Sequence, residues 1–136
     1  MTQEEKDLLI KDLCGRLPYG IKIMIDDKYL TEDMIKSGYD KIQELYGITY
    51  EGNVELLNMD YHMPVESIKP YLFPMSSMTE EQDKEYALLQ TSAGNEGFLY
   101  PWNCANMVKW LIENHFDYNG LIPMGLAKDA TNLDIY

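Results

Sequence analysis

The chain has 136 residues, of which 46% are hydrophobic and 25% charged, which is the length and apolar content of one soluble globular domain with a hydrophobic core. Eleven Lys and Arg residues oppose 23 Asp and Glu residues, so the net charge is −12. A surface this acidic repels phosphate backbones and anionic lipid, which argues against direct binding of nucleic acid or membranes. It favours a basic protein partner, unless the charge serves solubility alone.

The sequence carries no signal for export or membrane insertion. No apolar run approaches the roughly 18 residues that cross a bilayer, and residues 1–6 lack the basic-then-apolar order of a secretory signal. We therefore expect a cytoplasmic protein. Cys14 and Cys104 lack the C-x-x-C spacing, and in a reducing compartment both are expected to be buried thiols without a disulfide or a shared metal.

The first predicted element is a helix over residues 3–14. Thr2 and Glu5 have the spacing of a capping box, four leucines recur near helical spacing, and Gly15 is a typical helix stop. The leucine face of this helix needs a surface to cover. Cys14 is expected on the buried side of the same helix.

Residues 20–73 are predicted to be rich in β-structure. Isoleucines at every second position of residues 21–25 indicate a half-buried strand. The clearest hairpin has strands over 42–50 and 54–57, joined by a turn that contains Gly52.

The segment between these strands allows two interpretations. We interpret residues 31–38 as an inserted loop. The second interpretation is a single helical turn, capped by Thr31 and ended by Gly38.

Residues 79–122 are predicted to be helical. The spacings Ser77-x-x-Glu80 and Thr79-x-x-Gln82 both fit a capping box, which opens a helix over residues 80–90. Asn103 is expected to cap a third helix, whose apolar residues cover about half its circumference and so predict heavy packing. Gly and Pro residues break the last part, 123–136, into a short irregular tail.

Together these elements predict a single α+β domain over residues 1–136. Its β-structure is expected to be a small antiparallel sheet or an SH3-like barrel, because four or five short strands are joined by tight turns. The N-terminal helix and the two C-terminal helices are expected to pack on it.

Three sequence blocks carry a resemblance to a known family. They are residues 13–22 (LCGRLPYGIK), 68–81 (IKPYLFPMSSMTEE) and 115–122 (HFDYNGLI), and they keep this order over nearly the whole chain. In these blocks the chain resembles a family of small uncharacterised proteins from gut anaerobic bacteria and their prophages. The resemblance implies a phage context but no activity, because the family has no assigned catalytic residues.

The sequence predicts no catalytic residue, no cofactor site and no metal site. His62 and His115 are the only imidazoles, and their spacing does not support zinc binding. Ser76 and Ser77 lack the Gly-x-Ser-x-Gly elbow of a serine nucleophile, and no phosphate-binding glycine loop occurs. Acidic pairs are numerous, but none has the apolar surroundings that would raise a pKa.

The aromatic residues are the candidate functional set. Tyr and Trp are favoured at protein interfaces because they cover apolar area and keep a polar tip, although the same residues also latch helices to a sheet within a core. An exposed subset around residues 100–102 would form a binding patch with an acidic rim. The candidate interaction surface consists of Tyr71, Phe73, Tyr100, Trp102, Phe116 and Tyr118.

The function that this pattern favours is a non-enzymatic protein-interaction module of phage or mobile-element origin. Its partner is an unknown protein, expected to be basic. A narrower hypothesis is an acidic DNA mimic that inhibits a host nucleic-acid enzyme, which requires acids clustered on one elongated face. The sequence is also compatible with a small hydrolase that uses a carboxylate pair and with a structural role in a homo-oligomer.

Overall fold

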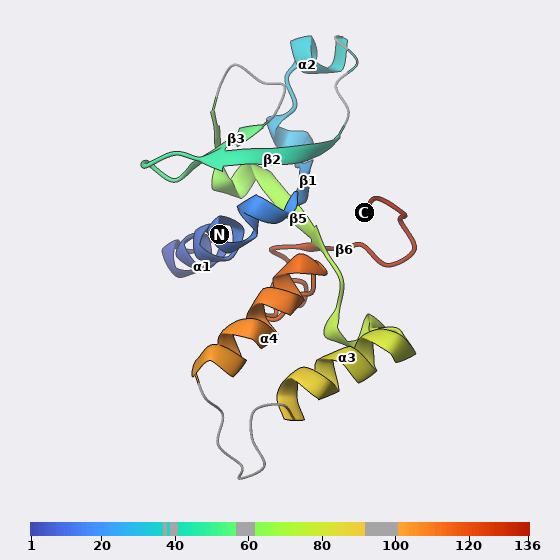
Figure 1. Cartoon of the computed structure of the whole chain (residues 1–136). Helices are drawn as coiled ribbons and strands as arrows, with labels where there is room; N and C mark the ends of the chain where they lie inside the picture. The colour runs from blue at the N-terminus through green and yellow to red at the C-terminus, as the bar shows by residue number, and fades with distance from the viewer. Residues whose placement is uncertain (37, 39–40, 57–61, 92–100) are drawn as a thin grey trace.

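The computed structural model describes residues 1–36, 38, 41–56, 62–91 and 101–136, and of residues 91 and 103 only the backbone. It combines helices with a sheet of short, mostly antiparallel strands, which makes the fold mixed α+β as predicted (Figure 1). The helices are α1 (Gln3–Arg16), α2 (Glu32–Lys36), α3 (Glu80–Thr91) and α4 (Pro101–Glu113). The strands are β1 (Lys22–Ile25), β2 (Ile42–Ile48), β3 (Asn53–Leu56), β4 (Met63–Pro64), β5 (Ile68–Leu72) and β6 (Lys128–Asp129). Short 3-10 helices cover Leu17–Tyr19, Asp27–Tyr29, Val65–Ser67 and Met75–Ser77.

The strands form an open sheet in the order β4-β3-β2-β1-β5-β6. All described neighbours are antiparallel except β5 and β6, which are parallel. Within the described residues the two edge strands, β4 and β6, do not pair with each other, so the sheet does not close and the SH3-like barrel is not confirmed. The predicted β-rich region forms an antiparallel sheet, while β6 gives a strand to the tail that was expected to be irregular.

Helix α1 covers one face of this sheet. Its capping box is confirmed, because Thr2 Oγ1 accepts from the backbone N–H of Glu5 and the Glu5 carboxylate accepts from the backbone N–H of Thr2. The helix continues to Arg16, two residues past the predicted end, because Gly15 stays out of the left-handed region. The left-handed residue is Gly20, with φ 72°, after a 3-10 turn.

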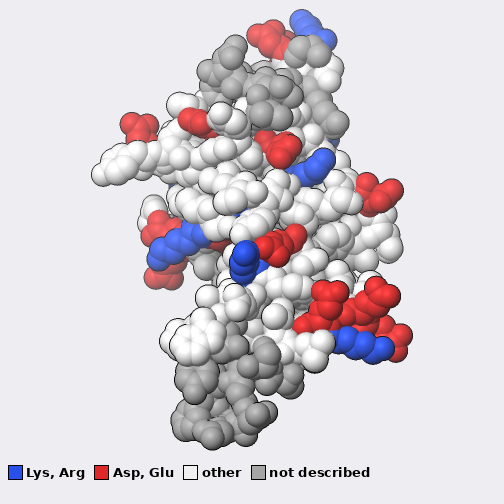
Figure 2. Space-filling model, viewed as in Figure 1, with Lys and Arg blue, Asp and Glu red and all other residues white. Residues whose placement is uncertain are grey.

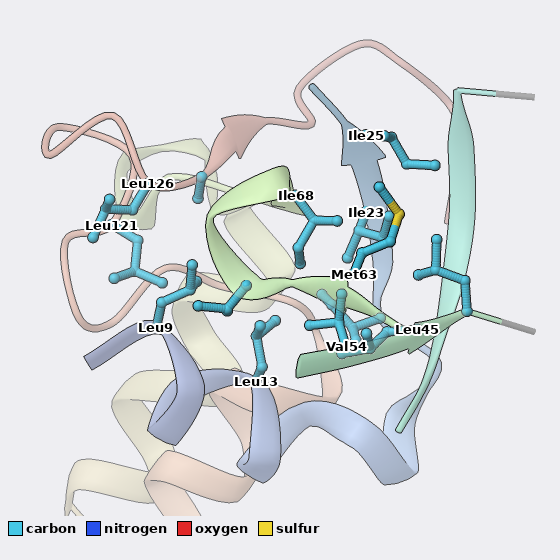
Figure 3. Packing of buried hydrophobic residues seen from close by; sticks show 14 of the residues in the cluster. Leu9, Leu13, Ile23, Ile25, Leu45, Val54, Met63, Ile68, Leu121 and Leu126 are labelled. Carbon is cyan, nitrogen blue, oxygen red and sulfur yellow. The ribbon is translucent and has the colours of Figure 1, made fainter. Parts of the chain in front are cut away.

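Buried aliphatic side chains join α1 to the sheet (Figure 3). Leu9 and Leu13 of α1 point toward Ile23 and Ile68 of the central strands, and all four are fully buried. Leu121 and Leu126, from the chain after α4, close one side of the same cluster. The predicted leucine face of the first helix is therefore confirmed as core.

Cys14 is exposed, not buried as predicted. It follows Leu13 directly, and one residue turns the side chain about 100° around a helix, which takes the thiol off the buried face. Cys104 on α4 is also exposed, and both cysteines are free. The expectation of two buried thiols was therefore wrong. Cys104 shares a helical face with Met107 and the buried Leu111, but it lies in the first turn of α4, and this end of the helix projects away from the sheet (Figure 1).

The segment predicted as an inserted loop forms α2. Thr31 Oγ1 accepts from the backbone N–H of Met34 at 3.2 Å, and Gly38 takes φ 73°, so the second interpretation, a capped helical turn, is the correct one. Met34 explains the outcome because its side chain is buried with the core and holds the turn against it.

Helices α3 and α4 lie side by side as a hairpin that extends from one end of the sheet (Figure 1). They were expected to pack on the sheet, but they pack mainly on each other. The C-terminal part of α4 also contacts the C-terminal part of α1. Thr79 and Gln82 form the capping box of α3, whereas the Ser77 hydroxyl donates to the carbonyl of Pro74. Helix α4 begins at Pro101, ahead of the expected cap, because proline suits the first helical position.

Shortening a side chain of the core should destabilise the protein. We expect Leu13→Ala to lower the free energy of unfolding by about 2 to 5 kcal/mol, because a fully buried leucine leaves a cavity when it is shortened. Leu133→Ala is the matched control, since Leu133 is 47% exposed and should change stability by less than about 0.5 kcal/mol. Urea denaturation measures both, and equal effects would contradict the assignment of Leu13 to the core.

Candidate functional site

The sheet and the helical hairpin meet at a junction built around a buried ion pair of α1. Asp12 and Arg16 are one helical turn apart, and their exposed fractions are 1% and 0%. Nε of Arg16 donates to Oδ1 of Asp12 at 2.5 Å, and Nη2 donates to Oδ2 at 3.2 Å. This two-pronged contact offsets the desolvation cost that either charge would carry alone.

The same ion pair binds the chain that follows α4. Nη2 of Arg16 donates to the carbonyl oxygen of Phe116 at 2.8 Å, and Nδ2 of Asn119 donates to Oδ2 of Asp12 at 2.8 Å. The guanidinium also lies over the ring of Tyr118, 5.1 Å from its centroid, in a cation–π contact. The ion pair belongs to α1 and its additional partners all lie in residues 116–119, so these contacts fix the two segments relative to each other.

A chain of ring contacts, which we call the ring stack, runs from α3 through the junction and the C-terminal residue to His115. Trp110 of α4 is central, with its ring centroid 5.7 Å from that of Tyr86 on α3 and 5.7 Å from that of Phe116. Both contacts are stacked, and each such pair contributes about 0.5 to 1.5 kcal/mol beyond burial. The ring stack consists, in order, of Tyr86, Trp110, Phe116, Phe73, Tyr136 and His115.

Hydrogen bonds to backbone groups hold the ring stack to the sheet. The N–H of Phe73 donates to the carbonyl of His115, and the N–H of Asp117 donates to the carbonyl of Phe73, both at 2.8 Å. The Tyr136 hydroxyl donates to the carbonyl of Tyr71 at 2.7 Å and accepts from the N–H of Lys22 at 3.0 Å. The segment after α4 and the C-terminal residue therefore both join the end of β5.

Four of the six predicted interaction residues lie around this junction. Tyr71 and Phe116 are buried, Phe73 is partly buried in the ring stack, and Tyr118 lies under Arg16. Burial raises the pKa of the Tyr118 hydroxyl, with a further contribution from Asp12. These four side chains connect elements of the fold and do not form one exposed patch.

The remaining two predicted residues lie at the start of α4. Trp102 is 61% exposed, and Tyr100 lies outside the described residues. The expected patch around residues 100–102 therefore stays a prediction, with an exposed indole as its one described aromatic member.

A second surface, which the sequence did not single out, lies between α3 and α4. A shallow groove of about 340 Å³ is lined by Glu85, Leu88 and Leu89 of α3 and by Trp110 of α4. The indole Nε1–H of Trp110 donates to Oε2 of Glu85 at 3.1 Å, which bridges the two helices. We call this surface the hairpin groove. Adjacent leucines near the end of an otherwise polar helix were the sequence signal for it.

A larger hollow of about 480 Å³ lies near the N-terminus, with Lys6, Lys28 and Lys69 among its lining residues. Three carboxylates line the same hollow, so its charges are largely balanced. One of them, Glu66, pairs with Lys6 at 3.2 Å, and a backbone hydrogen bond together with this lysine lowers its pKa. A general acid needs the opposite shift, so Glu66 does not suit that role.

The residues that the structure describes contain no candidate metal site. Nowhere in those ranges do three His, Cys, Asp or Glu side chains converge. His62 pairs with Glu55 on the surface at 3.0 Å, and His115 belongs to the ring stack. Among the described helices, none has the length and apolar character to cross a bilayer.

Comparisons with known proteins give no match: no protein-family model, no curated protein and no solved structure matches this chain. The resemblance to phage-associated proteins therefore stays a prediction. Function has to be inferred from the geometry of the chain's own residues, chiefly the junction and the hairpin groove.

The buried ion pair gives a prediction with a built-in rescue. We expect Arg16→Met to destabilise the fold by about 3 to 5 kcal/mol, because Asp12 would be left buried without its cation. The double variant Arg16→Met with Asp12→Leu should regain most of this loss, since two apolar residues remove both charges together. Guanidinium denaturation compares the three proteins, and a double variant as unstable as the single one would contradict the pairing.

His115 gives a pH prediction. Burial lowers its pKa from 6.5 to about 4, with a smaller contribution from the charge of Arg16. Between these values the unfolded chain binds more protons than the folded one, so stability is fully present above pH 6.5 and falls as the pH drops toward 4. Because His115 is partly exposed, we expect a loss of about 1 to 2 kcal/mol.

The control is His115→Asn, which removes the titrating group while tolerating the backbone φ of 61° at this position. The difference between the two stability curves isolates His115 from His62 and from the carboxylates. Thermal melts from pH 7 to 4 measure it, and parallel curves would refute the assignment.

Proposed function

We propose that the protein is a non-enzymatic protein-interaction module and that the hairpin groove is its binding surface. The observation that carries this proposal is an apolar groove fixed in shape by its own contacts and set on an acidic helix. A cytoplasmic location and an origin in a phage or mobile element belong to the same proposal.

Trp110, which forms the floor of the groove, is already held in place in the free protein. The Trp110 indole is stacked on Tyr86 and on Phe116, and Glu85 accepts its N–H. These three contacts stabilise the observed orientation of the ring. A surface that is already ordered loses little conformational entropy on binding, which favours affinity.

The groove is also apolar where it meets solvent. Leu88 is 67% exposed, and it lines the groove together with Leu89 and Trp110. A single exposed leucine is ordinary on a protein surface, but one that continues an apolar groove is typical of a docking site. Binding would remove this leucine from water and supply apolar stabilisation.

The DNA-mimic and hydrolase hypotheses find less support in the geometry. A DNA mimic needs its acids in one elongated band, whereas on the face in Figure 2 they lie in several separate groups, with a concentration over α3. A hydrolase needs a carboxyl group with a raised pKa in a hollow, and the shift at Glu66 is in the opposite direction.

The proposal predicts the effect of one polar substitution. We expect Leu88→Gln to abolish stoichiometric capture of the cellular partner, because the groove loses apolar contact while glutamine keeps the helix. Leu133→Gln makes the same chemical change at an exposed leucine outside the groove and should capture normally. Affinity capture from nuclease-treated lysate of the natural host, read by quantitative mass spectrometry, compares both variants with the wild type. Equal capture by all three would overturn the assignment of binding to this groove.

A further inference from the structure

We infer that the occupant of the hairpin groove is a basic amphipathic helix of a partner protein, with its apolar face on Leu88, Leu89 and Trp110 and its Lys or Arg side chains along the acidic stripe of α3. This inference rests on the proposed function, and it adds the secondary structure and the charge of the partner.

The charge follows from the positions of acids on α3. Glu81, Glu85 and Leu88 recur at i, i+4 and i+7, so they share one stripe of the helix. Glu85 and Leu88 line the groove, and Glu81 continues their stripe toward the start of the helix. Helix α3 carries four acids and one lysine, and acidic side chains gather over it in Figure 2. An apolar anchor bordered by acids is complementary to apolar residues flanked by bases.

The helical form follows from what the groove offers a ligand. It lies between two helices whose backbone groups bond within each helix, so an extended peptide would find no strand edge to pair with there. Side chains of a third helix fit between two parallel ridges of side chains. Helix α3 has 12 residues, about 18 Å of length, which matches about three turns of a partner helix.

The charge also favours a different protein over a second copy. Each chain carries a net charge of −12, and pairing two hairpin grooves would bring two acidic α3 helices together. Like charges at an interface oppose association, most strongly at low ionic strength. With a basic partner the electrostatic interaction at the groove is attractive instead of repulsive.

The test uses a synthetic peptide of about 14 residues, made of Leu and Lys with the leucines on one helical face, and a counterpart with every Lys replaced by Glu. The protein carries Trp102→Phe, so that Trp110 in the groove is the single tryptophan. We expect the Leu–Lys peptide to shift the Trp110 emission saturably and the Leu–Glu peptide to leave it unchanged. Raising the salt concentration to about 0.5 M should weaken the binding.

A charge reversal on each side of α3 separates the groove from a general attraction to an acidic protein. Glu81 lies on the groove stripe, while Asp83 is exposed on the opposite side of the same turn. We expect Glu81→Lys to weaken the peptide about three- to ten-fold and Asp83→Lys to weaken it less than two-fold. Equal weakening by both variants would overturn the inference, because the attraction would then be to net charge alone.

The apolar contact has its own pair of variants. Leu88→Gln should weaken the Leu–Lys peptide about ten-fold, and Leu133→Gln should leave its affinity unchanged. Circular dichroism and thermal melting of every variant verify that it is folded, and all four positions are exposed.

The outcomes distinguish this inference from the proposed function. If both peptides bind equally well and depend on Leu88, the groove is a docking site without charge preference, and only the inference fails. Absence of binding by the Leu–Lys peptide also overturns the inference, while the capture experiment with Leu88→Gln decides the proposed function independently. Concentration-dependent dimerisation that Glu81→Lys strengthens and Leu88→Gln abolishes would replace the basic helix by a second copy.

Discussion

The buried ion pair between Asp12 and Arg16 is the constraint on which the placement of the surrounding elements depends. Two charges without solvent need partners in fixed positions, and this pair draws its additional partners from residues 116–119, a hundred positions along the chain. The pair thereby turns a one-turn feature of α1 into a long-range connection. It sets where the chain leaves α4, and so sets how the α3–α4 hairpin meets the sheet.

The ring stack carries this placement outward to the surface. Phe116, whose carbonyl accepts from Arg16, is also the ring on which Trp110 stacks, and Trp110 is the floor of the hairpin groove. The groove is therefore linked to the core by consecutive contacts between named side chains. Without these contacts the α3–α4 hairpin would be free to pivot relative to the sheet. With them, Trp110 is held against Phe116 and so against the core. The same residues that close the core thus also shape the surface that we propose binds a partner.

Local signals in the sequence predicted the local structure well. The Thr2–Glu5 and Thr79–Gln82 capping boxes and the turn at Gly52 fixed two helix starts and one hairpin, because each depends on residues close in sequence. The open sheet was not distinguishable from a barrel, since closure depends on pairing between distant strands, and β6 comes from a tail without a strand signal. The role of Arg16 was also hidden: its partner Asp12 is adjacent on the helix, but burial of the pair depends on Phe116 and Asn119. The hairpin groove required knowledge of which faces of α3 and α4 meet.

We propose that the protein binds its partner on the outer surface of α3 and α4. Hydrogen–deuterium exchange of the wild-type protein, with and without the Leu–Lys peptide, tests it without any substitution. We predict slower exchange confined to residues 80–91 and 101–113, with the β2–β3 hairpin and α1 unchanged. Protection located on the sheet, or spread evenly over the chain, would contradict binding at the hairpin groove.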